Sequence, residues 1–99
     1  MPAESAAVTV VVPRTLMSVA GERHRLSVQV GAGCTIAGLL DLLAADYPVF
    51  DRRVRDETGA LRRYVNVYLD GEDVRHLNGA QTEVRSGQEI QIIQSVAGG

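Results

Sequence analysis

The pattern of apolar and polar positions predicts four short β-strands along the chain. Val8–Val12 is rich in β-branched residues and ends at a proline, which is typical of a buried strand. In three other segments apolar residues alternate with polar ones, which predicts strands with one buried and one exposed face: His24–Val30, Tyr64–Leu69 and Glu89–Ile93. The first two strands, joined by a turn, predict a hairpin.

A helical spacing follows Gly31–Gly33. Apolar residues recur there at positions i, i+3, i+4 and i+7, which form one stripe of a helix: Ile36, Leu39, Leu40 and Leu43. Thr35 is placed to cap this helix, and the residue before Pro48 is pushed out of the helical region, which ends it. Gly38 within the helix indicates close packing against the sheet. Residues 50–63 are polar and predict a loop with at most one helical turn.

Turn dipeptides divide the second half of the chain. Asp70-Gly71 and Asn78-Gly79 each predict a tight turn, with Glu72–Leu77 between them as a short strand or an extended return. The order is therefore strand, strand, helix, strand, short strand, strand. If the last strand lies between the first and the third, this order predicts an α+β fold: a β-grasp (ubiquitin-like) mixed sheet packed on one main helix.

The length and composition predict one small globular domain over residues 1–99. The chain has 99 residues, of which 45% are hydrophobic and 22% charged, and a second domain would have no core of its own. Residues 94–99 are polar and glycine-rich, so we expect them to form an extended C-terminal tail. No apolar run approaches the ~20 residues of a membrane-spanning helix. Residues 1–7 lack the pattern of a secretory signal, and we expect a cytoplasmic protein that does not associate with membranes.

The charge balance disfavours a nucleic-acid partner. Lysine and arginine together number 10 against 12 acids, for a formal net charge of −2. Every basic residue is an arginine, and lysine is absent. Five arginines flank the polar loop and would form a basic patch, but acids interspersed among them favour a mixed, solvated face: Arg52, Arg53, Arg55, Arg62 and Arg63, with Asp51, Asp56 and Glu57.

The remaining reactive residues do not assemble into a catalytic motif. Cys34 is a single cysteine, which excludes an internal disulfide and gives no sign of an oxidising compartment. It precedes the expected helix, where a thiol pKa can fall, so a redox or sulfur-relay role is the alternative to an inert thiol. His24 and His76 lack metal-ligand spacing, and we expect no metal site. Nucleotide-binding, hydrolase and metalloprotease motifs are also absent, which disfavours an enzyme with its own active site.

The sequence ends in Val96-Ala97-Gly98-Gly99. Two terminal glycines are compatible with a frayed end, but after the last strand of a small β-grasp domain they indicate a carboxylate delivered to a partner. Glycines have no Cβ, so the backbone can extend through a narrow channel. A Gly99 carboxylate that attacks the α-phosphate of ATP becomes an acyl-adenylate, and a sulfur nucleophile that displaces AMP leaves a thiocarboxylate. Gly99 would then carry the sulfur, while Val96, Ala97 and Gly98 thread into partner active sites.

Several stretches of the chain resemble a known family. These are VTVVVP at Val8–Pro13, TIAGLLDLL at Thr35–Leu43, RYVNVYLDGEDVR at Arg63–Arg75, GQEIQII at Gly87–Ile93 and the final VAGG. On these residues the chain resembles the MoaD/ThiS/CysO family of ubiquitin-like sulfur carrier proteins over nearly its whole length. The third stretch is most similar to the actinobacterial CysO type.

The resemblance implies a set of partners. An E1-like adenylyltransferase/sulfurtransferase would use ATP to activate the tail, with no cofactor bound to the chain itself. A sulfur-accepting synthase would then take the sulfur for cysteine or a sulfur-containing metabolite, and in CysO-type pathways a metalloprotease releases the product. The chain would therefore be a protein cosubstrate rather than an enzyme.

The globular part is expected to contact the activating partner. Strand parity places Tyr64, Tyr68 and Ile93 on the outer sheet face, where exposed apolar and aromatic side chains would form a docking patch. The alternative is that these are scattered exposed residues of the ordinary kind.

Two other functions use the same tail. One is a ubiquitin-like protein modifier conjugated to target lysines, and the other is the small subunit of a molybdopterin synthase. Because the chain lacks lysine, one copy cannot be attached to a side-chain amine of another, so only single modification of targets is open.

Overall fold

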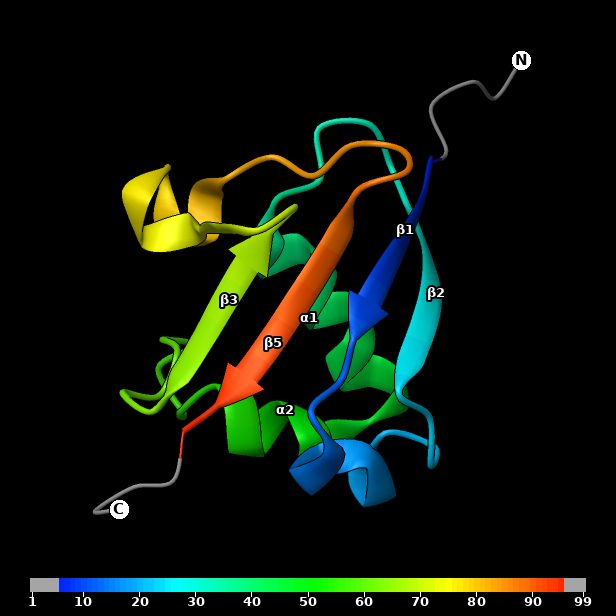
Figure 1. Ribbon diagram of the computed structural model, residues 1–99, viewed down its shortest axis with the longest axis vertical. Helices are drawn as coiled ribbons and strands as arrows, with labels where there is room; N and C mark the ends of the chain where they lie inside the picture. Colours follow the sequence, from blue (N-terminus) through cyan, green and yellow to red (C-terminus); the bar gives the residue numbers. More distant parts are fainter. Residues whose placement is uncertain (1–5, 96–99) are drawn as a thin grey trace.

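Residues 6–95, which the computed structural model describes, form a five-stranded mixed sheet (Figure 1). Its strands are β1 (Ala6–Val11), β2 (Arg25–Val30), β3 (Val65–Leu69), β4 (Glu72–Asp73) and β5 (Glu89–Gln94), in the spatial order β2-β1-β5-β3-β4. β5 is central, parallel to β1 and antiparallel to β3, and the two outer pairs are antiparallel. The predicted place of the last strand, between the first and the third, is confirmed.

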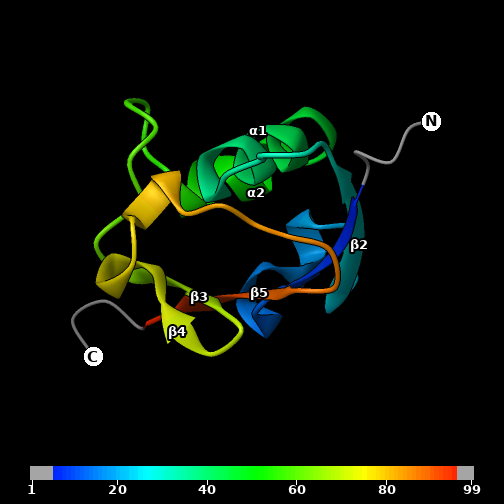
Figure 2. The same cartoon turned by 90° about the horizontal axis from the view of Figure 1, so that it is seen from above.

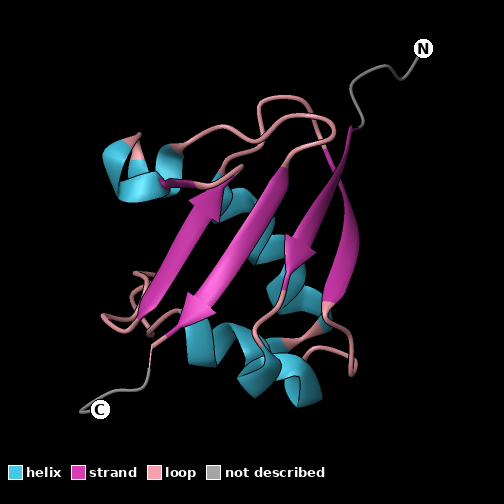
Figure 3. Ribbon diagram, in the orientation of Figure 1, coloured by secondary structure: helices cyan, strands magenta, loops and turns pink. Residues whose placement is uncertain are grey.

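Two α-helices, α1 (Ile36–Asp46) and α2 (Pro48–Val54), lie together on one face of this sheet (Figure 2). Three short 3-10 helices complete the fold: η1 (Arg14–Val19), η2 (Val74–His76) and η3 (Gly79–Gln81) (Figure 3). The opposite face of the sheet carries no α-helix within residues 6–95. Within the same range no helix is long and apolar enough to cross a membrane.

The predicted cap and apolar stripe of α1 are confirmed. The hydroxyl of Thr35 accepts a hydrogen bond from the Gly38 N–H at 3.2 Å, which satisfies one of the free amides of the first turn. The buried residues of the helix are those of the predicted stripe: Ile36, Leu39, Leu40 and Leu43. They pack against the inward faces of the strands, where the side chains that alternate into the core are Val8, Val10, Val65, Val67, Ile90 and Ile92.

The loop predicted over residues 50–63, with at most one helical turn, begins only after Val54, because α2 covers Pro48–Val54. Pro48 ends α1 and also begins α2, because its fixed φ suits the first position of a helix. Phe50 and Val54, spaced i, i+4, are fully buried and anchor α2 to the core. The seven-residue helix is therefore held by tertiary packing of two apolar side chains.

Gly38 does not serve the helix–sheet contact that the sequence predicted. A Cβ built on Gly38 would lie 3.2 Å from the sulfur of Cys34 and 3.7 Å from the hydroxyl of Thr35. The small residue therefore makes room for the side chains of the helix cap, and that prediction was wrong.

The links between strands also differ from simple turns. β1 and β2 pair in the antiparallel register predicted for a hairpin, but η1 lies in their connection and buries Leu16 in the core. The Asp70-Gly71 turn is confirmed, with φ of 48° and 90° at the two residues. Within the predicted segment Glu72–Leu77, only Glu72–Asp73 is a strand, because the chain then enters η2 with Val74 buried.

Candidate functional site

The carboxyl end of β5 is held by hydrogen bonds from two neighbouring segments. Thr15 at the start of η1 donates from its hydroxyl to the Gln94 side-chain oxygen at 2.7 Å. The Ser95 N–H donates to the carbonyl oxygen of Tyr64 at 2.8 Å, so the pairing with the β3 side continues one residue past the strand. Gln94, predicted as the first residue of the tail, is instead the last residue of β5. The chain is therefore held at this end of the sheet as far as Ser95.

The predicted sulfur-carrying residue, Gly99, and the predicted threading residues Val96, Ala97 and Gly98 lie outside the described residues. Their roles therefore stay predictions. The described part of the chain ends at Ser95, at the same end of the molecule as α2 and η1 (Figure 1).

Tyr68 and Ile93 share the open face of the sheet, as strand parity predicts. Tyr68 is opposite Gln91 on β5, and Ile93 is opposite Asn66 on β3, so the two apolar side chains are diagonal neighbours. Ile93 is 37% exposed, whereas Tyr68 is half-buried. Together they form a small apolar surface, which we call the Tyr68 face.

Tyr64 differs from the other two predicted docking residues. It precedes β3 and is half-buried, with its side chain packed against the hydrophobic core. Its ring therefore contributes to the core, and its carbonyl oxygen holds the end of β5.

Arg75 is a neighbour of the Tyr68 face that the sequence did not indicate. Its guanidinium donates to the side-chain oxygen of Asn66 and, at 3.0 Å, to Asp73. The side chain and the backbone N–H of Arg75 both donate to Asp73, and these hydrogen bonds lower the pKa of that carboxyl. Strand alternation could have placed Asn66 on this face. Arg75 could not be placed in this way, because it lies in η2 and the turn after β3 brings it next to the sheet.

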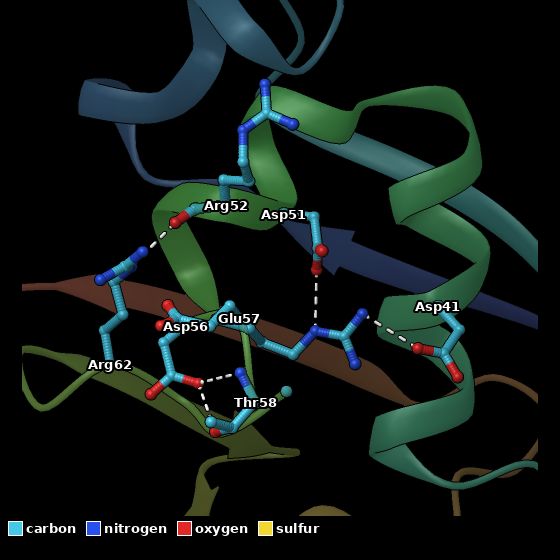
Figure 4. A pocket seen from close by; sticks show the side chains of 9 residues that line it. Asp41, Asp51, Arg52, Asp56, Glu57, Thr58 and Arg62 are labelled. Atoms are coloured by element: carbon cyan, nitrogen blue, oxygen red, sulfur yellow. Dashed lines mark hydrogen bonds and ion pairs between the residues drawn. The ribbon is translucent and has the colours of Figure 1, made fainter.

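A polar pocket of about 420 Å³ lies between α1, α2 and the loop that follows α2 (Figure 4). Arg55 spans it, with Nε donating to Asp51 at 2.7 Å and Nη2 lying 2.9 Å from Asp41. Burial alone would lower the pKa of Arg55, but the hydrogen bonds to Asp51 and Asp41 raise it overall. The predicted mixture of arginines and acids is present here, but Arg55 is not solvated as predicted, because its side chain is 11% exposed and its charge is paired within the fold.

The loop on the other side of this pocket is also satisfied internally. Asp56 accepts hydrogen bonds from the hydroxyl and the N–H of Thr58, at 2.5 and 2.8 Å, and these lower the pKa of its carboxyl (Figure 4). Over residues 6–95 no three potential ligand side chains are grouped to hold a metal ion. His24 lies with Nδ1 2.8 Å from the Val12 carbonyl oxygen and so joins the ends of β1 and β2.

Cys34 is less reactive than its position in the sequence suggested. Burial, and then the negative charge of Asp41, raise the pKa of the thiol. Its sulfur lies 3.4 Å from the Thr35 carbonyl oxygen, in the cap of α1. The raised pKa supports the inert thiol rather than the alternative redox or sulfur-relay role.

Comparison with known proteins identifies relatives over most of the chain. The pattern of the ThiS family matches residues 10–99. The sulfur carrier protein CysO of Mycobacterium tuberculosis is 34% identical over 94 residues, which cover 93% of this chain and 98% of the relative.

Solved structures agree with the sequence matches. A chain in the crystal structure of the Amycolatopsis orientalis BexX/CysO complex is 32% identical, with a TM-score of 0.75 over 93% of this chain and 99% of the matched one. The small archaeal modifier protein 1 of Haloferax volcanii is 26% identical, with a TM-score of 0.81 over 95% of this chain and 100% of that one. The resemblance to sulfur carriers noted on the sequence is confirmed, and the chain belongs to the ThiS family of β-grasp proteins, in which its relatives include the sulfur carrier CysO.

Proposed function

We propose that the protein is a sulfur carrier whose Gly99 carboxylate is converted to a thiocarboxylate and used as a sulfur donor. The observation that carries this proposal is the family match, which extends through both terminal glycines to residue 99. The identity to CysO over almost the whole chain supports the same function. On this view the chain is a cosubstrate, and the catalytic groups belong to its partners in the cytoplasm.

The proposed chemistry has two steps. A carboxylate oxygen of Gly99 attacks the α-phosphorus of ATP, pyrophosphate leaves, and an acyl-adenylate forms on an E1-like partner. A sulfur nucleophile then attacks the acyl carbon, the bond to AMP breaks, and the thiocarboxylate remains. ATP is bound and consumed by the partner, and this chain holds no cofactor in the cycle.

The anchored end of β5 supports this role because it sets the reach of the tail. Gly99 is the fourth residue after Ser95, and a fully extended chain spans at most roughly 3.3–3.6 Å per residue, or about 14 Å here. The active site of the partner must therefore lie within that distance of the sheet. It follows that the partner has to contact the globular domain as well.

The Tyr68 face is our candidate for that docking contact. Tyr68→Ala and Ile93→Asp are expected to raise the KM for this chain in adenylation while leaving kcat unchanged, because neither side chain reaches the reacting carboxylate. Leu42→Asp is the matched control, since Leu42 is 44% exposed but lies on α1, on the other side of the sheet. If the two face variants are adenylated like the wild type, the face is not the docking site.

The later partners follow from the same proposal. A sulfur-accepting synthase would take the sulfur from the thiocarboxylate, for cysteine or another sulfur-containing metabolite. A metalloprotease would then cleave from the tail a product that had formed as an adduct of it. The relative in the BexX/CysO structure was solved as a complex with another protein, which supports action through partners.

The direct test is the intact mass of the chain after incubation with ATP, an E1-like enzyme and a sulfide source. We expect an increase equal to the exchange of one oxygen atom for one sulfur atom. A variant lacking Gly99 should show no increase. An unchanged mass for the wild-type chain, under conditions in which the enzyme charges its own carrier, would contradict the proposal.

A protein modifier is the second candidate, favoured by the similarity to the small archaeal modifier protein 1. The same acyl-adenylate would then be attacked by a lysine amine of a target protein. Isolation of this chain joined to target lysines in cell extract would support that function. The third possibility, a molybdopterin synthase subunit, stays a prediction and would show as a stable complex with a larger chain.

A further inference from the structure

The arginines of the described chain fall into two groups. Four have a carboxylate within 4 Å: Arg25, Arg55, Arg75 and Arg85. For the other six, no ion pair to a residue of the described range occurs: Arg14, Arg23, Arg52, Arg53, Arg62 and Arg63. Five of these six belong to η1, α2 and the segment before β3, which meet at one end of the molecule (Figure 1).

Four of them are exposed and lie on segments at the same end of the molecule as the end of β5 (Figure 1). Arg14 precedes Thr15, whose hydroxyl holds Gln94, and Arg63 precedes Tyr64, whose carbonyl holds Ser95. Arg52 and Arg53 are adjacent on α2. Their helix is tied to the segment before β3 by the Arg62 side chain, whose Nε donates to the Arg52 carbonyl oxygen at 2.8 Å. We call Arg14, Arg52, Arg53 and Arg63 the basic collar.

Two of the four acids in the neighbouring segments already have partners within the fold. Asp51 is engaged by Arg55, and Asp56 by Thr58, both inside the pocket of Figure 4. In the same view the Arg52 guanidinium points away from both carboxylates. Residues 14–22, 50–57 and 62–64 together hold six arginines and four acids, whereas the whole chain has a net charge of −2. Positive charge is therefore concentrated at the end from which the tail leaves.

We propose that the basic collar docks onto an acidic rim around the tail channel of the protein that activates the tail. This inference rests on the proposed function, because the short reach of the tail forces the collar to face that partner. Guanidinium groups form bidentate contacts with carboxylates, and complementary charge around a narrow entrance speeds association and orients it. The collar and the Tyr68 face are separate surfaces with separate residues.

An acidic protein fits the collar better than a nucleic acid does. The rest of the chain is acidic, so a polyanion extending beyond the collar would be repelled. Four guanidiniums around a strand end do not form the extended basic stripe of a nucleic-acid groove.

Charge reversal at single collar positions tests the proposal. Arg52→Glu and Arg63→Glu are compared with Arg85→Glu, which makes the same charge change at an exposed arginine that precedes the opposite end of β5. Each variant is assayed for adenylation by the E1-like enzyme that charges the wild type, over a range of NaCl concentrations. We expect the KM of the collar variants to rise about tenfold at low salt, with kcat unchanged, and the salt dependence of kcat/KM to weaken. Arg85→Glu should behave like the wild type.

The outcomes separate the collar from the function on which it rests. If the wild type is adenylated but the collar variants match Arg85→Glu, or if kcat/KM of the wild type does not change with NaCl, the collar proposal is wrong and the function stands. If the wild type is never adenylated, both fail. A single-stranded oligonucleotide that binds the wild type at 150 mM NaCl and loses affinity in the collar variants, without a change in KM, would assign the collar to nucleic acid instead. Thermal melts of all variants confirm that the exposed substitutions leave the fold intact.

Discussion

Replacing Arg55 with alanine removes the guanidinium that joins α1 to α2. The side chain of Arg55 is 11% exposed, and its partner Asp51 is 23% exposed, so this contact is shielded from water on both sides. A hydrogen bond to a charged group contributes about 1.5–3 kcal/mol, and Asp51 would lose its partner in a half-buried position. The second partner, Asp41, is 71% exposed, and such a surface ion pair contributes at most about 1 kcal/mol.

From these contacts we expect Arg55→Ala to lower the free energy of unfolding by about 2 kcal/mol. For a domain of this size that loss corresponds to a fall in Tm of roughly 10 °C. Asp41→Ala is the matched control and should cost at most about 1 kcal/mol, because its carboxylate is largely in water.

Urea denaturation followed by circular dichroism measures both variants, and a double-mutant cycle with Asp51→Ala isolates the coupling between Arg55 and Asp51. We expect a larger coupling free energy for Arg55 with Asp51 than for Arg55 with Asp41. Equal losses for Asp41→Ala and Arg55→Ala, or a loss below about 0.5 kcal/mol for Arg55→Ala, would refute it.

Three further predictions concern single side chains. Leu39→Ala should cost about 2–5 kcal/mol in urea denaturation because Leu39 is fully buried in α1, and an equal cost for Leu42→Ala, on the exposed side, would contradict this. Thr58→Ala should raise the pKa of Asp56 in an NMR titration. Hydrogen bonds lower that pKa in the folded state, so the stability they give is present above the pKa of the unfolded chain and is lost as the pH falls through the folded value. Cys34, whose thiol pKa is raised, should react with iodoacetamide at pH 8 more slowly than a cysteine in an unfolded peptide, and an equal or faster rate would contradict its burial.

The sequence predicted those elements in which one periodicity extends over several residues. The stripe from Ile36 to Leu43 marks α1 because four apolar positions repeat at helical spacing, and each of them is buried. Alternation in Val65–Leu69, and as far as Ile92 in β5, predicted which side chains face the core and which face outward. These patterns are visible in the sequence because each of these elements buries only one face.

The parts that were missed depend on few residues or on tertiary contacts. α2 carries only two buried apolar side chains, Phe50 and Val54, among charged neighbours, so no stripe develops. Pro48 followed by this i, i+4 pair was the available signal. The environment of Cys34 could not be read from its place before a helix, because burial and the charge of Asp41 outweigh the effect of the helix end. The basic collar joins segments far apart in the sequence, and only the fold brings them together.

The most direct test of the central claim is to locate sulfur in the C-terminal tryptic peptide. Trypsin cleaves after arginine, so the peptide of residues 86–99 is released, and it contains neither cysteine nor methionine. After incubation with ATP, the E1-like enzyme and sulfide, a sulfur carrier yields this peptide with one oxygen replaced by sulfur at the Gly99 carbonyl. An unmodified peptide, under conditions in which the enzyme charges its own carrier, would contradict the account.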